Sequence, residues 1–321
     1  MAIDEFELID RYFRRERGAG VALGIGDDGA LLNVPPGQQL VAVVDTSVAG
    51  VHFPTDLDPA DIGYRAVAVN LSDLAAMGAT PAWMTLALTL PASEPAWLEA
   101  FANGLFAAAD EYDVALVGGD TTRGEQTVIS VQLLGLLKNN TGLLRSGCRS
   151  GDGIYVSGTL GDAAAGLSLI QQTAVENELT ARFRRPSARV KLGQAVNGVA
   201  SAGIDISDGL YADLQRILVA SGVGATIECR QLPVSSALLA YAGDESARRL
   251  ALEGGDDYEL CLTVPAAADA EFRRIAAQLG VAVTRIGSAD NVPGMRLTDS
   301  GRAVEFSSAG YRHFTNQDSS G

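Results

Sequence analysis

Short apolar runs that end at an acidic turn recur along this chain and constrain both its fold and its chemistry. In these turns an aspartate stands beside Gly, Ser or Thr, mostly where an apolar run stops or a helix begins. Carboxylates that converge on one crevice would repel one another unless cations lay between them. The pattern therefore predicts Mg²⁺ and a phosphate-bearing ligand. The turns are Gly26-Asp27-Asp28, Val44-Asp45-Thr46, Leu71-Ser72-Asp73, Gly118-Gly119-Asp120, Asp205-Ile206-Ser207-Asp208-Gly209 and Gly254-Gly255-Asp256-Asp257.

The alternation of apolar runs with helical patterns indicates an α/β protein. We expect a strand over 40–44 that ends at Asp45, and a strand over 114–117 that leads into the turn at Gly118. Asp58-Pro59 should start a helix that Gly78 closes. Further strands are expected over 83–90, 128–137, 154–157, 203–206, 258–264 and 281–286, and further helices over 5–15, 95–112, 186–200, 208–220 and 266–279. A boundary near residue 150 divides the chain into domains 1–150 and 151–321.

Composition excludes several classes of protein. A chain of 321 residues is too long for one ordinary core, which favours two domains. A net charge of -15 argues against nucleic-acid binding. No apolar run reaches the ~18 residues of a membrane span, and the acidic N-terminus does not resemble a signal peptide, so a cytoplasmic location is expected. Three cysteines without CxxC spacing and only two histidines argue against disulfides and a structural zinc site.

Two of the acidic motifs of the first half, those at Asp28 and Asp73, each have a plainer alternative. The sequence from Gly24 to Gly29 has the letters GxGxxG, but two adjacent aspartates would repel a pyrophosphate. A metal-ligand turn is the better interpretation, and an exposed acidic turn is the alternative. Asp73 lies in a helix that is apolar nearly all round, so its carboxylate needs a cation, a pairing partner or a local backbone hydrogen bond.

The glycine-bearing and basic motifs also leave alternatives open. Ser207 or Asp208 could simply cap a helix, or Asp208 could bind phosphate through a bridging metal ion. Adjacent glycines before Asp120 would let backbone amides approach a ligand closely, although a simple turn would look the same. Among the basic residues we favour only Arg145 as a phosphate ligand, since solvated surface accounts for most of the cluster at 182–191.

The order and spacing of these motifs resemble the thiamine-monophosphate kinase family, in the superfamily of aminoimidazole ribonucleotide synthetase. The resemblance covers nearly the whole chain. Selenophosphate synthetases of the same superfamily fit less well, because they carry a reactive Cys or selenocysteine near the N-terminus and the first cysteine here is Cys148. Besides the acidic turns, the resemblance rests on Gly50-Val51-His52-Phe53, Ala75-Ala76-Met77-Gly78-Ala79, Arg145-Ser146-Gly147, Gly151-Asp152, Gly161-Asp162-Ala163-Ala164-Ala165-Gly166-Leu167 and Tyr258-Glu259-Leu260.

The resemblance implies a two-domain fold in which each domain is a mixed sheet flanked by helices, and a homodimer formed through the N-terminal domains. It implies that ATP phosphorylates thiamine monophosphate to thiamine diphosphate with several Mg²⁺ ions. The implied Mg²⁺ ligands are Asp28, Asp45, Asp73, Asp120, Asp205 and Asp208. The implied nucleotide contacts are Gly119, Asp120, Arg145 and Ser207, and the implied contacts to thiamine monophosphate are His52, Asp256 and Tyr311.

Two positions depart from the family pattern. Val43 and Val44 stand where the family often has Ser or Thr, so only their backbone carbonyls could coordinate a metal ion. Asp256 stands where the family usually has Glu. Because Asp is one methylene shorter, its contact with the substrate could be direct, bridged by water or lost.

The implied acceptor is a phosphate oxygen, whose second pKa is about 6, so it is mostly ionised at neutral pH. No general base is then required, and we expect direct in-line transfer without a phosphoenzyme, with Arg145 helping to stabilise charge. Two alternatives remain at this point. One is another ATP-dependent member of the superfamily that activates an amide or formyl oxygen, and the other is a non-enzymatic regulator that binds Mg²⁺ and nucleotide.

Overall fold

The computed structural model describes residues 5–15, 18–139, 141–173 and 175–306, and its contacts divide the chain into two units, Met1–Gly142 and Leu143–Gly321. The division falls eight residues before the boundary expected at residue 150. The segment after Gly142 belongs to the second unit because it packs there: the Gly203 amide donates to the Leu144 carbonyl at 3.0 Å, and Cys148 lies in that unit's core.

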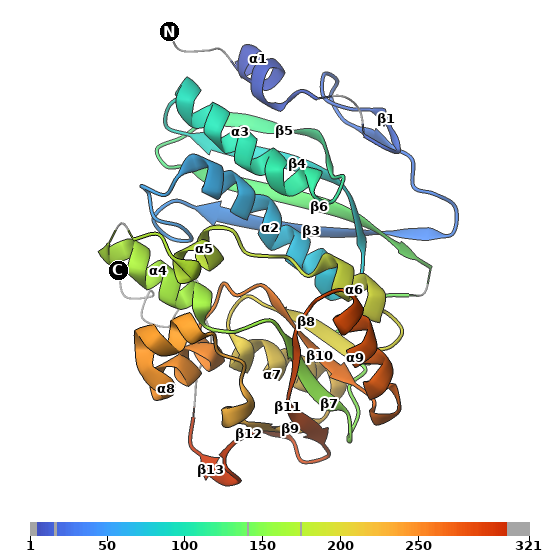
Figure 1. The fold of residues 1–321 in the computed structure, drawn as a ribbon. Helices are drawn as coiled ribbons and strands as arrows, with labels where there is room; N and C mark the ends of the chain where they lie inside the picture. Colours follow the sequence, from blue (N-terminus) through green and yellow to red (C-terminus); the bar gives the residue numbers. More distant parts are fainter. Residues whose placement is uncertain (1–4, 16–17, 140, 174, 307–321) are drawn as a thin grey trace, which may run out of the picture. The chain divides into compact units, whose positions relative to one another are not determined.

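The N-terminal unit is built on a mixed four-stranded sheet of order β3-β6-β4-β5, in which only β4 and β5 are parallel (Figure 1). A two-stranded ribbon, β1 with β2, precedes it. The elements are α1 (Glu5–Leu8), a π-helix η1 (Ile9–Phe13), β1 (Val21–Leu23), β2 (Leu31–Leu32), β3 (Gln38–Val48), α2 (Pro59–Met77), β4 (Thr80–Leu90), α3 (Pro95–Asp110), β5 (Ala115–Arg123) and β6 (Val128–Lys138).

Helix α2 has the bounds that its sequence predicts. The Asp58 side chain caps its N-terminus by accepting from the Ala60 amide, and Pro59 occupies the first turn. Gly78 closes the helix in the left-handed conformation, with φ of 69°. The helix packs against β3, β4 and β6, which explains why its sequence is apolar nearly all round.

Helices α2 and α3 lie side by side (Figure 1), and two glycines set how closely they approach. A Cβ atom at Gly63 would lie 2.1 Å from the Phe101 carbonyl oxygen. On the facing helix, a Cβ atom at Gly104 would lie 1.8 Å from the Ala60 carbonyl oxygen. The backbones are therefore in direct contact, with no room for a side chain at either position.

The C-terminal unit is built on a seven-stranded sheet of order β13-β12-β9-β11-β7-β10-β8, in which only β12 and β9 are parallel. Its strands are β7 (Gly153–Ser157), β8 (Ala202–Ile206), β9 (Gly224–Glu228), β10 (Glu259–Val264), β11 (Val283–Asp290), β12 (Gly294–Asp299) and β13 (Arg302–Val304). Its helices are α4 (Asp162–Gln172), α5 (Glu178–Arg184), α6 (Val190–Val196), α7 (Leu210–Ser221), α8 (Ser236–Glu253) and α9 (Asp269–Gln278), with 3-10 turns η2 (Cys229–Gln231) and η3 (Ala266–Ala268).

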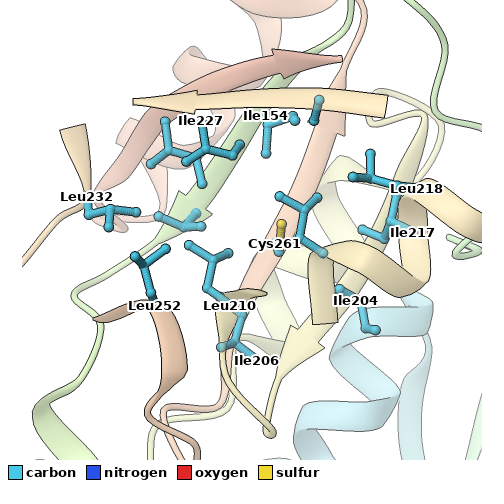
Figure 2. Packing of buried hydrophobic residues seen from close by; sticks show 14 of the residues in the cluster. Ile154, Ile204, Ile206, Leu210, Ile217, Leu218, Ile227, Leu232, Leu252 and Cys261 are labelled. Carbon is cyan, nitrogen blue, oxygen red and sulfur yellow. The ribbon is translucent and has the colours of Figure 1, made fainter. Parts of the chain in front are cut away.

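Both faces of this sheet are covered by helices. Ile154 and Ile204 point into a core that Leu210, Ile217 and other apolar residues of α7 complete (Figure 2). Tyr155, the neighbour of Ile154 in β7, points to the other face, where its ring lies 4.9 Å from that of Phe272 in α9. The strands β7, β8 and β10 are buried along their whole length, which explains why their sequences do not alternate between apolar and polar residues.

Several elements differ from the sequence-based expectation. Strand β3 continues past Asp45 to Val48, and β5 continues through Gly118 and Asp120 to Arg123. The helix expected over 186–200 is confined to Val190–Val196. Strands β9, β12 and β13 and helix α8 are not among the elements that the sequence predicts. Within the described part of the chain, no helix is long and apolar enough to cross a membrane.

The glycine contact between α2 and α3 gives a testable consequence. Gly63→Ala should lower the free energy of unfolding by about 2–3 kcal/mol, because the methyl group must push the two helix backbones apart. Thermal and urea unfolding measure the change. Gly29→Ala is the control, since no atom lies within 4 Å of its Cβ position. Equal stability of the two variants would contradict the backbone contact.

Candidate functional site

Two of the acidic motifs lie side by side in the C-terminal unit. Strands β8 and β10 are antiparallel neighbours, with Ile206 opposite Glu259. Beyond the strand ends the pairing continues, because the Tyr258 amide donates to the Ile206 carbonyl at 2.8 Å and the Asp256 amide donates to the Ser207 carbonyl at 2.9 Å. The turn that carries Asp256 is therefore hydrogen-bonded to the end of β8, which carries Asp205, and to the loop that carries Ser207 and Asp208.

A buried carboxylate holds the backbone of that loop. Asp213, in the first turn of α7, is fully buried, and one of its oxygens accepts the amide protons of both Ser207 and Asp208 at 3.0 Å. The arrangement resembles the back-reaching carboxylate of a capping box, and it also places negative charge at the positive end of the helix. Sequence reasoning missed Asp213. The signal was a carboxylate in the first turn of a helix that follows Ser-Asp-Gly.

Arg216 joins two carboxylates of the same segment. Its guanidinium binds Asp213 through one terminal nitrogen and Asp208 through the other. Burial raises the pKa of Asp213 to about 7, and the charges of Asp205 and Asp208 add to the effect. Asp205 is itself buried on β8. The loop is thus rich in negative charge, and Arg216 offsets part of it.

Asp256 and Tyr258 adopt backbone conformations that are uncommon for residues other than glycine. Their φ angles are 71° and 51°, and the Tyr258 hydroxyl donates to an Asp256 carboxylate oxygen at 3.2 Å. Asp is among the residues most often found at positive φ, whereas longer side chains are less common there. The turn therefore gives a local reason for Asp256 where the family usually has Glu, and strained turns of this kind cluster at functional sites.

The adjacent Asp257 has a structural role. Its buried carboxylate accepts the amide protons of Gly161, at 2.7 Å, and Ala163, at 3.4 Å, and so caps the start of α4 from a different part of the chain. Burial holds the pKa of this carboxyl well above its ordinary value. The two aspartates of the motif therefore differ in exposure: Asp256 is half-exposed in the turn, and Asp257 is buried.

Glu259, just past this turn, anchors two arginines of the basic cluster. Arg182 binds its carboxylate at 2.7 Å, Arg189 binds both oxygens, and the Ser157 hydroxyl donates at 2.6 Å. The carboxylate also fills the space beside Gly158, where a Cβ atom would lie 2.1 Å from it. Arg182 and Arg189 therefore stabilise the fold from within, as expected for paired buried charges.

In the N-terminal unit, Asp45 and Asp120 lie within strands and not at their ends. Asp45 pairs with Val131 in β6, and Asp120 pairs with Ala87 in β4. Both strands run on because their polar residues lie at the edges of the sheet, where β3 and β5 each have one neighbouring strand. Three strand spacings separate β3 from β5, or about 14 Å of sheet, which is too far for Asp45 and Asp120 to ligate one ion directly.

Of the two glycines before Asp120, Gly119 serves strand packing, whereas no atom lies within 4 Å of the Cβ position at Gly118. The register between β4 and β5 shifts by one residue between Met84 and Thr85, which marks a bulge beside Gly118. At Gly119 the φ angle is 155°, and a Cβ atom would lie 1.9 Å from the Leu86 carbonyl oxygen. The absence of a side chain at Gly119 is therefore required by the neighbouring strand, whatever else approaches it.

The remaining expected site residues lie on separate elements. Asp28 is exposed in a turn where its amide donates to the Asp27 carboxylate, and Asp73 is half-buried on α2. His52 follows β3, and its Nδ1 accepts the Val48 amide proton at 3.0 Å. Arg145 lies exposed in the C-terminal unit, with its carbonyl bound by the Ser221 hydroxyl. Tyr311 lies outside the described residues.

Chemically, the described groups offer oxygen donors and no reactive thiol. Within residues 5–15, 18–139, 141–173 and 175–306, no three His, Cys, Asp or Glu side chains are close enough together to hold a metal ion. The cysteines Cys148, Cys229 and Cys261 are all buried, and burial raises the pKa of each thiol, that of Cys148 to about 11. At neutral pH these thiols are protonated and shielded from solvent.

Comparison with known proteins matches the chain to two family models, one for each half. Residues 26–137 match the family model of the AIR synthase related protein, N-terminal domain, and residues 149–300 match that of its C-terminal domain. Over 98% of its length, the chain is 50% identical to the thiamine-monophosphate kinase of Salmonella typhimurium, 99% of which is covered. The chain belongs to the thiamine-monophosphate kinase family. This confirms the predicted family, its α/β fold class and its enzyme class, thiamine-phosphate kinase (EC 2.7.4.16).

Solved structures of the thiamine-monophosphate kinase family have the same fold. The crystal structure of the enzyme from Stenotrophomonas maltophilia K279a is 45% identical, with a TM-score of 0.86 over 95% of this chain and 99% of that one. A structure of AaThiL complexed with AMPPCP and TMP is 34% identical, with a TM-score of 0.78 over 90% of this chain and 92% of that one.

The anchor at Glu259 gives a testable consequence for stability. Glu259→Gln should lower the free energy of unfolding by about 3–5 kcal/mol, because it leaves two partly buried guanidinium groups without their carboxylate. Denaturant unfolding measures this. As a control, Glu271→Gln removes an exposed pair with Arg274 and should change stability by less than about 1 kcal/mol. A small effect at both positions would show that the buried cluster is dispensable.

Proposed function

We propose that the chain transfers the γ-phosphoryl group of ATP directly to the phosphate of thiamine monophosphate, giving thiamine diphosphate and ADP in a Mg²⁺-dependent reaction. One observation carries the proposal beyond family membership. The Asp256 amide donates to the Ser207 carbonyl, so the residue expected to contact the acceptor is bonded to the loop expected to contact metal and nucleotide. Donor and acceptor phosphates would then meet above one pair of strands.

The residues present fit Mg²⁺. Their donors are carboxylate and hydroxyl oxygens, which hard divalent cations prefer, and Mg²⁺ is commonly held by one or two carboxylates together with substrate phosphates. A cation already lies on Asp208, since the Arg216 guanidinium occupies that carboxylate. Asp205 and Asp208 would hold Mg²⁺ in the C-terminal unit, and Asp28, Asp45, Asp73 and Asp120 in the N-terminal unit. When bound, Mg²⁺ supplies charge neutralisation between the two polyanions.

The chain's own side chains and backbone would position the substrate phosphates and offset part of their negative charge. Because Nδ1 of His52 accepts the Val48 amide proton, Nε2 carries a proton that can be donated to the acceptor phosphate. In the C-terminal unit, Arg145, exposed on an anchored backbone, and Ser207 would bind phosphate oxygens of the nucleotide. In the N-terminal unit, the backbone at Gly119 would contact the nucleotide. The acceptor oxygen is already ionised, so no side chain has to remove a proton. A phosphate trapped on the chain after incubation with labelled ATP would contradict direct transfer.

The proposed reaction is tested by ADP release. With purified protein, ATP and thiamine monophosphate, a coupled assay should show ADP formation that requires both the acceptor and Mg²⁺, with thiamine diphosphate as the product. Aminoimidazole precursors serve as the comparison acceptor. Turnover on those precursors alone would favour activation of an amide or formyl oxygen. ATP binding without turnover on any acceptor would favour a regulator.

Two carboxylates of the N-terminal unit should be individually essential. Asp73→Asn and Asp120→Asn should each lower kcat at least about 100-fold, which is roughly 2.7 kcal/mol of transition-state stabilisation. The reason is the loss of one charged oxygen ligand for Mg²⁺ in each case. Steady-state kinetics at saturating Mg²⁺ measure the effect, and unchanged melting temperatures show that folding is intact. Near-normal kcat in either variant would remove that residue from the metal ligands.

We further propose a homodimer formed through the sheet of the N-terminal unit. Helix α2 covers one face of this sheet, and the hydrogen bond between the Thr46 and Ser130 hydroxyls, 2.7 Å long, marks the other. Leu40 and Val44 point to that second face with 46% and 60% of their surface exposed. Apolar residues exposed in a row on a sheet favour burial against a second copy of the chain.

The dimer is tested by changing that row. Val44→Lys should convert the protein from dimer to monomer, because two lysines would be buried against each other across the interface. Light scattering after size-exclusion chromatography measures the mass. Val219→Lys, at an apolar position of α7 that is 77% exposed, is the matched control and should stay dimeric. A monomeric parent protein, or a Val44→Lys variant of unchanged mass, would contradict the interface.

A further inference from the structure

Arg216 binds two carboxylates that differ in how firmly they are held. Its guanidinium lies between Asp213, whose side chain is fully buried, and Asp208, whose side chain is 27% exposed. The other oxygen of Asp213 accepts the amide protons of Ser207 and Asp208, both at 3.0 Å. Asp213 is therefore fixed by backbone hydrogen bonds as well as by Arg216.

Asp208 is the carboxylate that can change its partner. It lies at the solvent side of the loop, and the side chain of Arg216 is itself 41% exposed. A guanidinium released from Asp208 would keep its bond to Asp213 and gain hydration for the nitrogen that is freed. Exchange at Asp208 therefore leaves the backbone of the loop in place, since Asp213 and not Asp208 secures it.

We propose that Arg216 is an internal counter-cation, which occupies Asp208 until a divalent cation displaces it. The inference rests on the proposed function, in which Asp208 is a Mg²⁺ ligand. In the metal-free protein Arg216 reduces the repulsion among Asp205, Asp208 and Asp213. When the cation binds, Arg216 turns away from Asp208 and remains on Asp213. Mg²⁺ thus binds a loop that is already shaped for it, at the cost of one ion pair.

Two measurable consequences follow from displacement. The Arg216 guanidinium becomes more accessible when the cation binds, and the cation binds more tightly when Arg216 no longer competes. An ion pair of this exposure corresponds to an affinity change of about two- to fivefold. An arginine that stays on both carboxylates would not become more accessible when the cation binds.

The first experiment measures the rate at which phenylglyoxal modifies Arg216 in the full-length protein, by peptide mass spectrometry with and without Mg²⁺. We expect the rate to rise about threefold or more with Mg²⁺, as the ion pair that shields the guanidinium opens. In Asp208→Asn the rate should be high and independent of Mg²⁺. Arg230, which pairs with Asp299 in the same unit, is the internal control and should not respond. A rate at Arg216 that is unchanged or lowered by Mg²⁺ overturns the proposal.

The second experiment measures Mn²⁺ binding to the full-length protein without nucleotide, by electron paramagnetic resonance of the free ion. Arg216→Met should bind Mn²⁺ about two- to fivefold more tightly than the parent. Arg216→Lys, which keeps the charge, should stay within about twofold of the parent, as should the surface control Arg230→Met. Unchanged or weaker binding in Arg216→Met overturns the proposal.

The two levels of failure can be told apart. If Asp208→Asn leaves both Mn²⁺ binding and kinase activity unchanged, Asp208 is not a metal ligand, and that part of the proposed function fails together with this inference. If Asp208→Asn weakens Mn²⁺ binding while Mg²⁺ does not change the reactivity of Arg216 in the parent protein, Asp208 remains a metal ligand. Only the displacement of Arg216 is then wrong.

Discussion

The pairing of β8 with β10 is the constraint on which the candidate site of the C-terminal unit depends. Because the two strands are antiparallel, the loop after β8 and the turn before β10 emerge at the same end of the sheet. Two hydrogen bonds past the strand ends carry the pairing into the loops themselves. Two motifs that are about fifty residues apart in sequence are thereby joined into one polar surface.

The acidic residues of this unit fall into two groups by how their charge is offset. Glu259 is bound by two arginines and a hydroxyl, and Asp257 by two backbone amides, so each is satisfied within the fold. In the loop after β8, by contrast, Arg216 serves both Asp208 and Asp213, with Asp205 nearby. Negative charge that the fold offsets only in part can attract the cations that an enzyme acting on phosphates binds.

The sequence predicts best where the cause of a structure is local. Helix α2 is bounded by a capping aspartate, a proline and a closing glycine, and its bounds were predicted to the residue. The motif order predicted the family, and with it the fold. Strand ends were predicted less well, because the extension of β5 past Gly118 depends on a bulge against β4 that no local signal reveals.

Contacts between distant residues explain the other differences. Residues 186–189, just before α6, are not helical. There the Arg189 side chain binds Glu259, seventy residues away in the sequence. Asp213 and Arg216 look like ordinary helix-surface residues until the loop that they bind is known. Asp257, which has a structural role, shares its motif with Asp256, which has a proposed functional role, and the sequence alone does not show that Asp257 is buried and Asp256 half-exposed.

The central claim is that these carboxylates bind nucleotide through cations. It is tested most directly by the melting temperature of the protein with a non-hydrolysable ATP analogue, measured in Mg²⁺ and again in EDTA. With Mg²⁺ present, the account predicts that the analogue raises the melting temperature, by an amount that corresponds to about 2.7 kcal/mol of stability when the analogue is at a hundredfold excess over its Kd. In EDTA most of this increase in melting temperature should be lost. An equal rise in both conditions would contradict the claim.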